Sequence, residues 1–192
     1  AYISGLEKRA AKGEDISKIA SVASFFLSRI DSNIDARIDQ KLKTIGTESE
    51  SEEARLKAFK GKVAIANAKI AYQKYKEIIT SDRWKALVEK GVKVQRLLWA
   101  CTSTKDPSYS DVMYVDELIG PDTVNTLPPN TIEACADHCN VASRIETGVK
   151  EANQLIESLK DTDININIDE VMDELLVDGI EKFVKPFESL MA

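Results

Sequence analysis

Hydrophobic and polar residues follow two different periods along this chain, and the short apolar runs predict three strands. The clearest run is Leu97-Leu98-Trp99-Ala100, which is too short for a typical helix and has the character of a buried strand. An earlier run is apolar except where Ser24 and Ser28 interrupt it. The predicted strands are residues 20–30, 92–100 and 122–127.

Around these strands, apolar residues recur at the longer period of amphipathic helices. Ile34, Ile38 and Leu42 show this spacing, and a longer pattern from Leu56 to Ile70 predicts one continuous helix. The predicted helices are residues 2–11, 31–42, 53–79, 84–90, 111–118, 131–139 and 148–159, followed by a final helix that ends at Val184.

Local residue chemistry predicts where several helices begin and end. Pro186 is expected to stop the last helix, because proline has no backbone N–H to donate. Residues 164–168 alternate like a strand and are predicted to be an extended connector. Residues 46–53 are polar, with several acidic side chains, and are predicted to form an exposed loop that runs into a helix. They lack EF-hand spacing, so we expect no metal site there. The candidate helix caps are Ser81 or Asp82, Asn130 or Thr131, and Asn167 or Asp169.

The order of elements predicts a helix-rich α/β fold. Strands separated by helices pair in parallel, with the helices packed outside the sheet. A complete eight-stranded β/α barrel takes about 250 residues. With 192 residues and three predicted strands, this chain is too short and too strand-poor to form a whole barrel.

Composition excludes several classes of partner. The formal charge is −6, with 32 acidic and 26 basic side chains, and no basic patch with interleaved aromatics points to nucleic acid. No apolar run approaches the roughly 20 residues of a membrane span. The three cysteines suggest reduced thiols, and residues 1–9 lack the apolar segment of a signal peptide. We therefore expect a cytoplasmic protein, with the plastid stroma as the alternative for a plant.

Candidate chemistry gathers where the second strand ends. Hydroxyl residues follow Ala100, then Lys105 adds a positive charge before Pro107. Parallel strands of α/β enzymes deliver their site residues at this end. Hydroxyls and an ammonium suit a phosphate or a sugar carbonyl. The alternative is a polar loop with a solvated lysine, since hydroxyl-rich turns are common.

Three segments resemble the transaldolase family, in its longer bacterial and plastid form. Residues 22–30, Val-Ala-Ser-Phe-Phe-Leu-Ser-Arg-Ile, resemble its sixth barrel strand. Residues 96–107, Arg-Leu-Leu-Trp-Ala-Cys-Thr-Ser-Thr-Lys-Asp-Pro, resemble the seventh, and residues 114–129 resemble the run through the eighth. The resemblance covers nearly the whole chain and implies the C-terminal part, about strands six to eight, of a single (β/α)8 TIM barrel domain over residues 1–192.

The resemblance implies chemistry like that of class I aldolases, without a metal or organic cofactor. A lysine forms a Schiff base with a ketose, and a dihydroxyacetone unit moves from sedoheptulose 7-phosphate to glyceraldehyde 3-phosphate. The family's lysine and acid/base carboxylates lie on its first five strands, so by resemblance no catalytic residue is in this sequence. We expect this chain to be inactive alone and to associate with the missing N-terminal half or with a second copy.

The resemblance also implies which residues bind the sugar phosphate substrate. In the Ser-x-Phe-x-x-Arg pattern, Ser24 should contact the substrate, Phe26 should shape the pocket and Arg29 should bind phosphate. Ser103 and Lys105 match positions near the phosphate on the seventh strand, whereas Cys101 replaces an expected serine. Without the family, a structural salt bridge of Arg29 with Asp31 or Asp35 remains the alternative.

Other readings compete with the phosphate site. Lys105 could itself form a Schiff base, but Asp106 beside it opposes the lowered pKa that a catalytic amine needs. Cys135, His138 and Cys139 could offer three metal ligands, but a structural zinc site needs a fourth, so we expect buried thiols and no metal. The chain could also be a non-catalytic helical interaction or regulatory protein, or part of a transaldolase–isomerase fusion.

Overall fold

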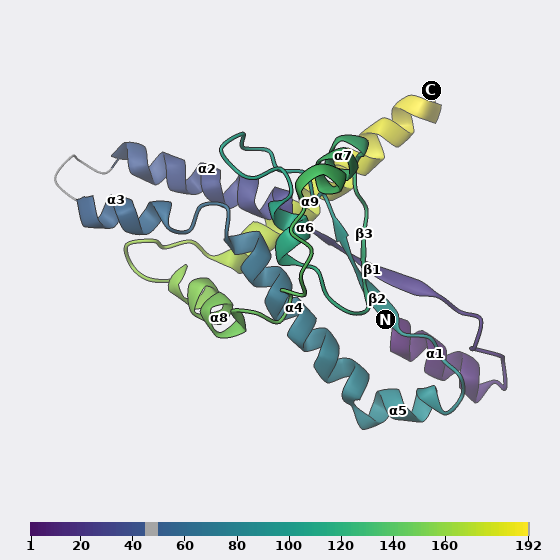
Figure 1. The fold of residues 1–192 in the computed structure, drawn as a ribbon. Helices are drawn as coiled ribbons and strands as arrows, with labels where there is room; N and C mark the ends of the chain where they lie inside the picture. The colour runs from purple at the N-terminus through teal and green to yellow at the C-terminus, as the bar shows by residue number, and fades with distance from the viewer. Residues whose placement is uncertain (45–49, 192) are drawn as a thin grey trace.

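The computed structural model describes residues 1–44 and 50–191. Residues 46–49 of the predicted acidic loop lie outside the described residues. The chain forms a helix-rich α/β fold around one small sheet (Figure 1). Its elements are α1 (Tyr2–Ala11), β1 (Ser21–Phe26), α2 (Ser28–Thr44), α3 (Glu50–Lys57), α4 (Val63–Thr80), α5 (Asp82–Val88), β2 (Gln95–Ala100), α6 (Met113–Glu117), β3 (Thr123–Asn125), α7 (Pro129–His138), α8 (Val149–Ser158) and α9 (Ile168–Met191).

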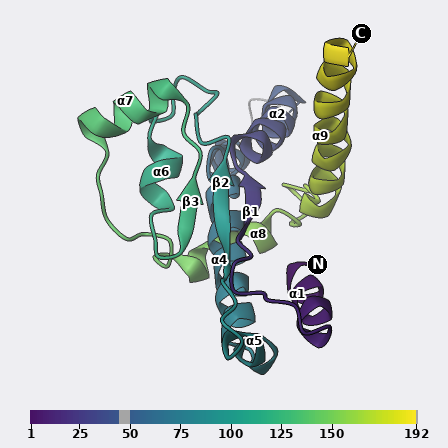
Figure 2. The same ribbon diagram turned by 90° about the vertical axis from the view of Figure 1, so that its right-hand side faces the viewer.

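The sheet has three parallel strands in the order β1-β2-β3, which confirms the predicted parallel pairing. Phe26 pairs with Ala100 at the end of β1 and β2, so the carboxyl ends of these two strands meet. In Figure 2, β1 lies at the sheet edge nearer α9, and β3 at the edge nearer α6 and α7. The predicted site residues at the end of β1 and after β2 therefore lie at the carboxyl end of the sheet.

The hydrophobic core lies on one face of the sheet, between the strands and the helices. Trp99 of β2 is 1% exposed and meets Phe25 of β1 edge to face, with ring centroids 5.7 Å apart. Helix α4 packs against α8 and α2 behind this pair. The opposite face of β1 is open, because Val22 and Phe26 are 41% and 37% exposed. Helices therefore cover one side of β1 much more than the other.

The first strand is shorter than predicted, because β1 ends at Phe26 and α2 begins at Ser28. The backbone N–H groups of Leu27 and Ser28 donate to the carbonyls of Ala100 and Cys101, at 3.0 and 3.1 Å. Cys101 then takes a φ of 54° and turns β2 away. Beyond Ser28 the first strand therefore has no β2 backbone beside it to pair with, and the chain continues as helix α2.

The long helix predicted over residues 53–79 is broken into α3 and α4. Gly61 lies at the break with a φ of 69°, a conformation that favours glycine. The first turn of α4 is also bound from outside: the N–H of Ala64 donates to Asp31 of α2 at 2.8 Å. The apolar period continues across the break, so periodicity alone predicts one helix where there are two.

Two other predicted helix ends are wrong and two caps are confirmed. Helix α7 starts at Pro129 rather than after Asn130 or Thr131, because proline fits the first helical position. Pro186 lies inside α9, which continues to Met191 through an exposed stretch. The confirmed caps are Ser81, which accepts from the N–H of Trp84 at 3.2 Å, and Asn167, which accepts from the N–H of Asp169 at 3.1 Å.

Candidate phosphate site

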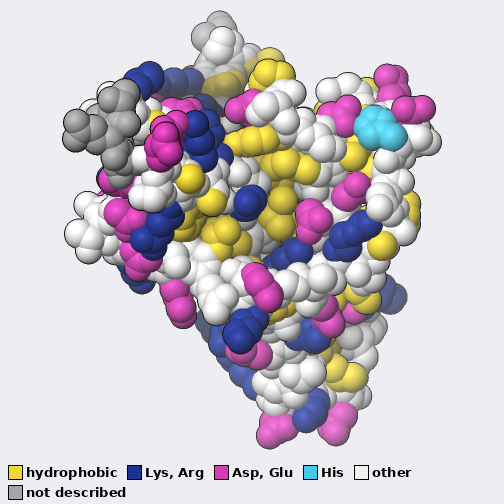
Figure 3. Space-filling view, turned by 60° about the vertical axis from the view of Figure 1, so that its left-hand side comes forward, with side chains coloured by type: hydrophobic (Ala, Val, Ile, Leu, Met, Phe, Trp, Pro, Cys, Tyr) yellow, Lys and Arg dark blue, Asp and Glu magenta, His cyan; other side chains and the backbone are white. Residues whose placement is uncertain are grey.

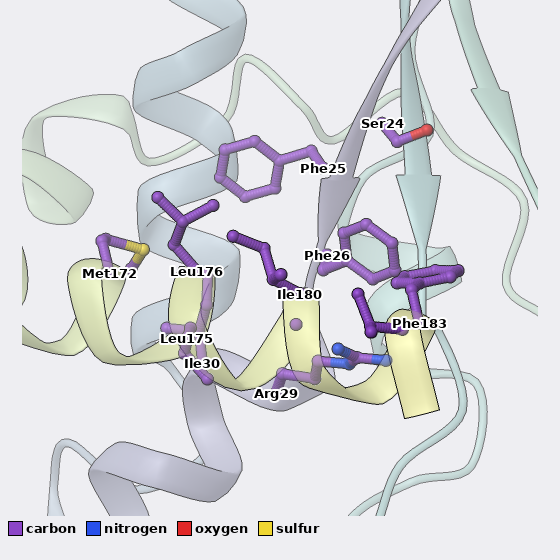
Figure 4. Close-up of a pocket in the computed structure, with 12 residues that line it drawn as sticks. Ser24, Phe25, Phe26, Arg29, Ile30, Met172, Leu175, Leu176, Ile180 and Phe183 are labelled. Atoms are coloured by element: carbon purple, nitrogen blue, oxygen red, sulfur yellow. The ribbon is translucent and has the colours of Figure 1, made fainter. Parts of the chain in front are cut away.

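A cavity of about 560 Å³ lies between the end of β1, the first turn of α2 and one face of α9 (Figure 4). It brings together the three predicted site residues of the first strand region, Ser24, Phe26 and Arg29. Most of the remaining lining is apolar and comes from α9, with Arg29 as the single charged side chain. The other lining residues are Phe25, Ile30, Met172, Leu175, Leu176, Gly179, Ile180, Phe183 and Val184.

Arg29 faces this cavity with a free guanidinium. Its Cζ lies 5.0 Å from the centre of the Phe26 ring, and Figure 4 shows the group directed toward Phe26 and Phe183. Within residues 1–44 and 50–191, no carboxylate forms an ion pair with it. The alternative of a salt bridge to Asp31 or Asp35 is therefore wrong. A half-buried cation over a ring is available for an anion.

The two site residues predicted in the second loop lie outside this cavity. Lys105 is exposed, and its Nζ donates to the hydroxyl of Ser103 at 2.9 Å. The loop is nevertheless attached to α2, because the Ser28 N–H donates to the Cys101 carbonyl. Cys101 is half-buried and takes a left-handed φ, which for a residue other than glycine is strained. The structure thus has two groups of site residues at the carboxyl end of the sheet, one on β1 and α2 and the other in the loop after β2.

Behind Arg29, α2 carries two buried aspartates that sequence reasoning did not include in the site. Asp31 is 2% exposed, and burial raises its pKa to about 6 despite the hydrogen bonds that Ala64 and Tyr114 donate to it. Burial also raises the pKa of Asp35, which accepts a hydrogen bond from Tyr109. Burial and the nearby carboxylates also raise the pKa values of Tyr109 and Tyr114.

Helix α9 is the other contribution that the sequence interpretation missed. Leu176, Ile180 and Phe183 line the cavity and are 63%, 56% and 68% exposed. Their spacing of four and three residues places them on one helix face, and this signal was readable in the sequence. What the spacing does not reveal is that this face lies against Arg29 and not against the main core.

The possible metal ligands at the end of α7 do not converge on one point. His138 contacts two aspartates, whereas Cys135 and Cys139 contact each other and are half-buried, not buried as predicted. His138 binds Asp111 and Asp137 at 2.8 and 3.0 Å, and these contacts raise its pKa. Figure 3 shows the single histidine on the surface with acidic side chains beside it, at some distance from the apolar area in the middle of this face. Burial and the neighbouring Cys135 raise the pKa of Cys139 to about 12. Across the described parts of the chain, no three His, Cys, Asp or Glu side chains are grouped to hold a metal ion.

Comparison with known proteins points to one family. A model of the family described as Transaldolase/Fructose-6-phosphate aldolase matches residues 6–192. Transaldolase 2 of Nostoc sp. is 75% identical over 191 residues, which are 100% of this chain and 50% of that protein. Transaldolase of Trichodesmium erythraeum is 72% identical with the same coverage. Transaldolase of Saccharopolyspora erythraea is 45% identical over 100% of this chain and 49% of that protein.

The relatives differ from this chain in length, since it spans about half of each of them. In the described residues, no helix is long and apolar enough to cross a membrane. The family match runs from within α1 through α9 and includes both groups of site residues. On the extent of this match and the identity to the relatives, the chain belongs to the Transaldolase/Fructose-6-phosphate aldolase family.

Proposed function

We propose that this chain forms the phosphate-binding part of a transaldolase. The intact enzyme transfers a dihydroxyacetone unit from sedoheptulose 7-phosphate to glyceraldehyde 3-phosphate through a lysine Schiff base, with no metal or organic cofactor. Arg29 binds the phosphate, Ser24 donates a hydrogen bond to the substrate and Phe26 shapes the pocket. Ser103 and Lys105 of the neighbouring loop provide a hydroxyl and a second cation for the same anion.

The observation that carries this proposal is the position of Arg29. The guanidinium faces a cavity beside the carboxyl end of β1 and has no carboxylate partner among residues 1–44 and 50–191. A guanidinium in such a place has lost part of its hydration, and a doubly charged phosphate restores favourable interactions. The proximity of Ser24 in the same cavity adds a neutral donor, as sugar phosphate binding requires.

The fold supports a partial barrel as the setting of this site. Three parallel strands in sequential order, joined by helices, match consecutive β/α units of a (β/α)8 barrel. Parallel sheets are usually covered on both faces, whereas β1 leaves Val22 and Phe26 exposed. In a barrel those side chains point inward, toward other strands. The open edge of β1 also suits pairing with the N-terminal half of the barrel or with a second copy.

The catalytic lysine is proposed to belong to that N-terminal half. Lys105, the alternative Schiff-base residue, is exposed, whereas a lysine nucleophile is usually desolvated in a pocket. Borohydride trapping with fructose 6-phosphate, read by intact mass, tests this directly on the 192-residue chain. We expect no adduct and no transaldolase turnover, and an adduct mapped to Lys105 would make that residue the electrophile.

The experiment that tests the phosphate site is titration calorimetry with fructose 6-phosphate. Arg29→Ala removes the charged contact, so we expect roughly 10- to 100-fold weaker binding. Arg37→Ala is the matched control, because Arg37 lies on the same helix but is paired with Glu174. Fructose without phosphate should bind equally to all three proteins. Equal binding of fructose 6-phosphate to the parent chain and to Arg29→Ala would refute the assignment.

A further inference from the structure

Two buried aspartate–tyrosine pairs connect α2 with the loop after β2. Asp31 and Asp35 are 2% and 9% exposed and lie one turn apart on the same side of α2. Each carboxylate accepts a hydrogen bond of 2.7 Å from a tyrosine hydroxyl, Asp31 from Tyr114 and Asp35 from Tyr109. The two tyrosines lie in one segment, and Tyr109 is four residues after Lys105. We call these four residues the carboxylate–tyrosine clamp.

The remaining oxygen of each carboxylate binds the turn that leads into α4. Asp31 Oδ1 accepts from the N–H of Ala64 at 2.8 Å, and Asp35 Oδ1 accepts from the N–H of Gly61 at 3.1 Å. A Cβ on Gly61 would come within 2.7 Å of the Tyr109 ring, so glycine allows this ring to lie against the backbone. In each aspartate, a backbone N–H thus binds one carboxylate oxygen, and this contact orients the other oxygen toward a tyrosine hydroxyl.

The loop of residues 101–112 is attached to α2 at both of its ends. At its start, the carbonyl of Cys101 accepts from the Ser28 N–H, and Thr102 donates to the carbonyl of Thr126 at 3.2 Å. Toward its end, Tyr109 binds the second turn of α2 through Asp35, and Tyr114, in α6, binds the first turn through Asp31. The stretch between, which carries Ser103 and Lys105, is therefore held between two attachments to one helix.

That helix is the one that presents Arg29. In a helix, residues two positions apart point in nearly opposite directions, so Arg29 faces the cavity while Asp31 faces the interior. A phosphate bound by two strands needs its donors placed within a fraction of an ångström of one another. The clamp lies where it can set this spacing, although its own side chains do not line the cavity.

We propose that Asp31, Asp35, Tyr109 and Tyr114 are positioning residues, which hold the Ser103–Lys105 segment at a fixed distance from Arg29 and so set the affinity for phosphate. This proposal rests on the function proposed above. It adds a role for four residues that do not contact the substrate and that neither the family resemblance nor the cavity identifies.

Tyrosine-to-phenylalanine variants of the 192-residue chain test the clamp, since they remove only a hydroxyl and keep the ring packing. For Tyr109→Phe and Tyr114→Phe, we expect about 3- to 10-fold weaker binding of inorganic phosphate. Without one clamp hydrogen bond, the loop must be ordered when phosphate binds, at a cost close to the free energy of that bond. Amide hydrogen exchange over residues 101–112 should rise at the same time. Tyr72→Phe is the matched control: Tyr72 is 4% exposed and donates to the carbonyl of Pro121, away from the clamp.

The outcomes separate the clamp from the phosphate site itself. If Arg29→Ala abolishes binding while both clamp variants bind as the parent does, the clamp is refuted and the phosphate site stands. If the parent chain binds neither phosphate nor fructose 6-phosphate, both proposals fall. If Tyr72→Phe weakens binding as much as Tyr109→Phe, the effect reflects general stability and the positioning role is wrong. Unchanged exchange over residues 101–112 would also refute it.

Discussion

Replacing Asp31 with asparagine should change how the stability of this chain depends on pH. Burial raises the pKa of Asp31 from an ordinary value of 3.8 to about 6 in the folded chain. Between these two values the folded state holds a proton that the unfolded state releases, so stability falls as pH rises. At about 1.4 kcal/mol for each pKa unit, the loss between pH 4 and pH 7 is about 3 kcal/mol.

Asparagine cannot ionise, so Asp31→Asn removes this loss. The variant still offers an oxygen to the N–H of Ala64, but its amide group now meets the hydroxyl of Tyr114. That rearrangement adds a constant offset of about 1 kcal/mol, which does not vary with pH. The quantity to follow is therefore the change with pH in the stability difference between parent and variant, rather than the stability at any one pH.

Urea unfolding from pH 4 to pH 7.5, followed by the fluorescence of Trp84 and Trp99, measures this difference. Relative to the parent, Asp31→Asn should gain about 3 kcal/mol as pH rises through this range. Part of the rise in the pKa of Asp31 comes from the nearby charge of Asp35, so the size of this gain also depends on the charge of Asp35. A difference that stays flat would show that the donors from Ala64 and Tyr114 outweigh burial.

An opposite-sign control is available in the loop after β2. Hydrogen bonds from Ser108 lower the pKa of Asp106, so its contribution to stability is lost as pH falls and not as pH rises. Asp106→Asn should therefore change the stability difference in the reverse direction and below about pH 4, so urea unfolding of this variant is extended to lower pH. If both variants shift the difference in the same direction, the assignment of burial as the dominant effect at Asp31 is wrong.

Two further substitutions test the packing and the corrected helix end. Gly120→Ala would place a Cβ 2.2 Å from Cγ2 of Ile145, whose side chain is fully buried at 0% exposure. We therefore expect urea unfolding to show roughly 1 to 3 kcal/mol of destabilisation. An unchanged unfolding midpoint would contradict this packing. Pro186→Ala restores a backbone donor in an exposed part of α9. Amide hydrogen exchange after residue 186 should therefore slow, while the unfolding midpoint hardly moves. Exchange equal to that of the parent would indicate that α9 ends before Pro186.

The elements that local sequence alone determines were the ones predicted well. The helix over Tyr2–Ala11 and the strand ending at Ala100 follow from apolar periodicity, and Ser81 is a cap because its own hydroxyl reaches the next turn. The break at Gly61 was missed because distant groups stabilise it. Asp31 and Asp35, some 30 residues earlier, bind the backbone of this turn. Gly61 is the one local signal of a break, but a single glycine is also tolerated inside a helix.

The candidate site was predicted in part for the same reason. Ser24, Phe26 and Arg29 were found together because they belong to one short pattern at the end of one strand. The face of α9 that lines the same cavity is more than 140 residues away in the chain, between Met172 and Val184. Its helical period was visible, but periodicity states only that a face is apolar and does not state which surface it covers.

One boundary error explains why an ion pair between Arg29 and Asp31 remained possible in the sequence. If Arg29 continued the strand, Asp31 would lie on the same face two residues later, and an ion pair between them would be reasonable. Because α2 already begins at Ser28, the same two residues point to opposite sides of a helix. Asp31 turns inward to Tyr114 and Ala64, and Arg29 is left facing the cavity without a carboxylate. A shift of only a few residues in where a strand ends thus converts a structural ion pair into a free cation beside a cavity.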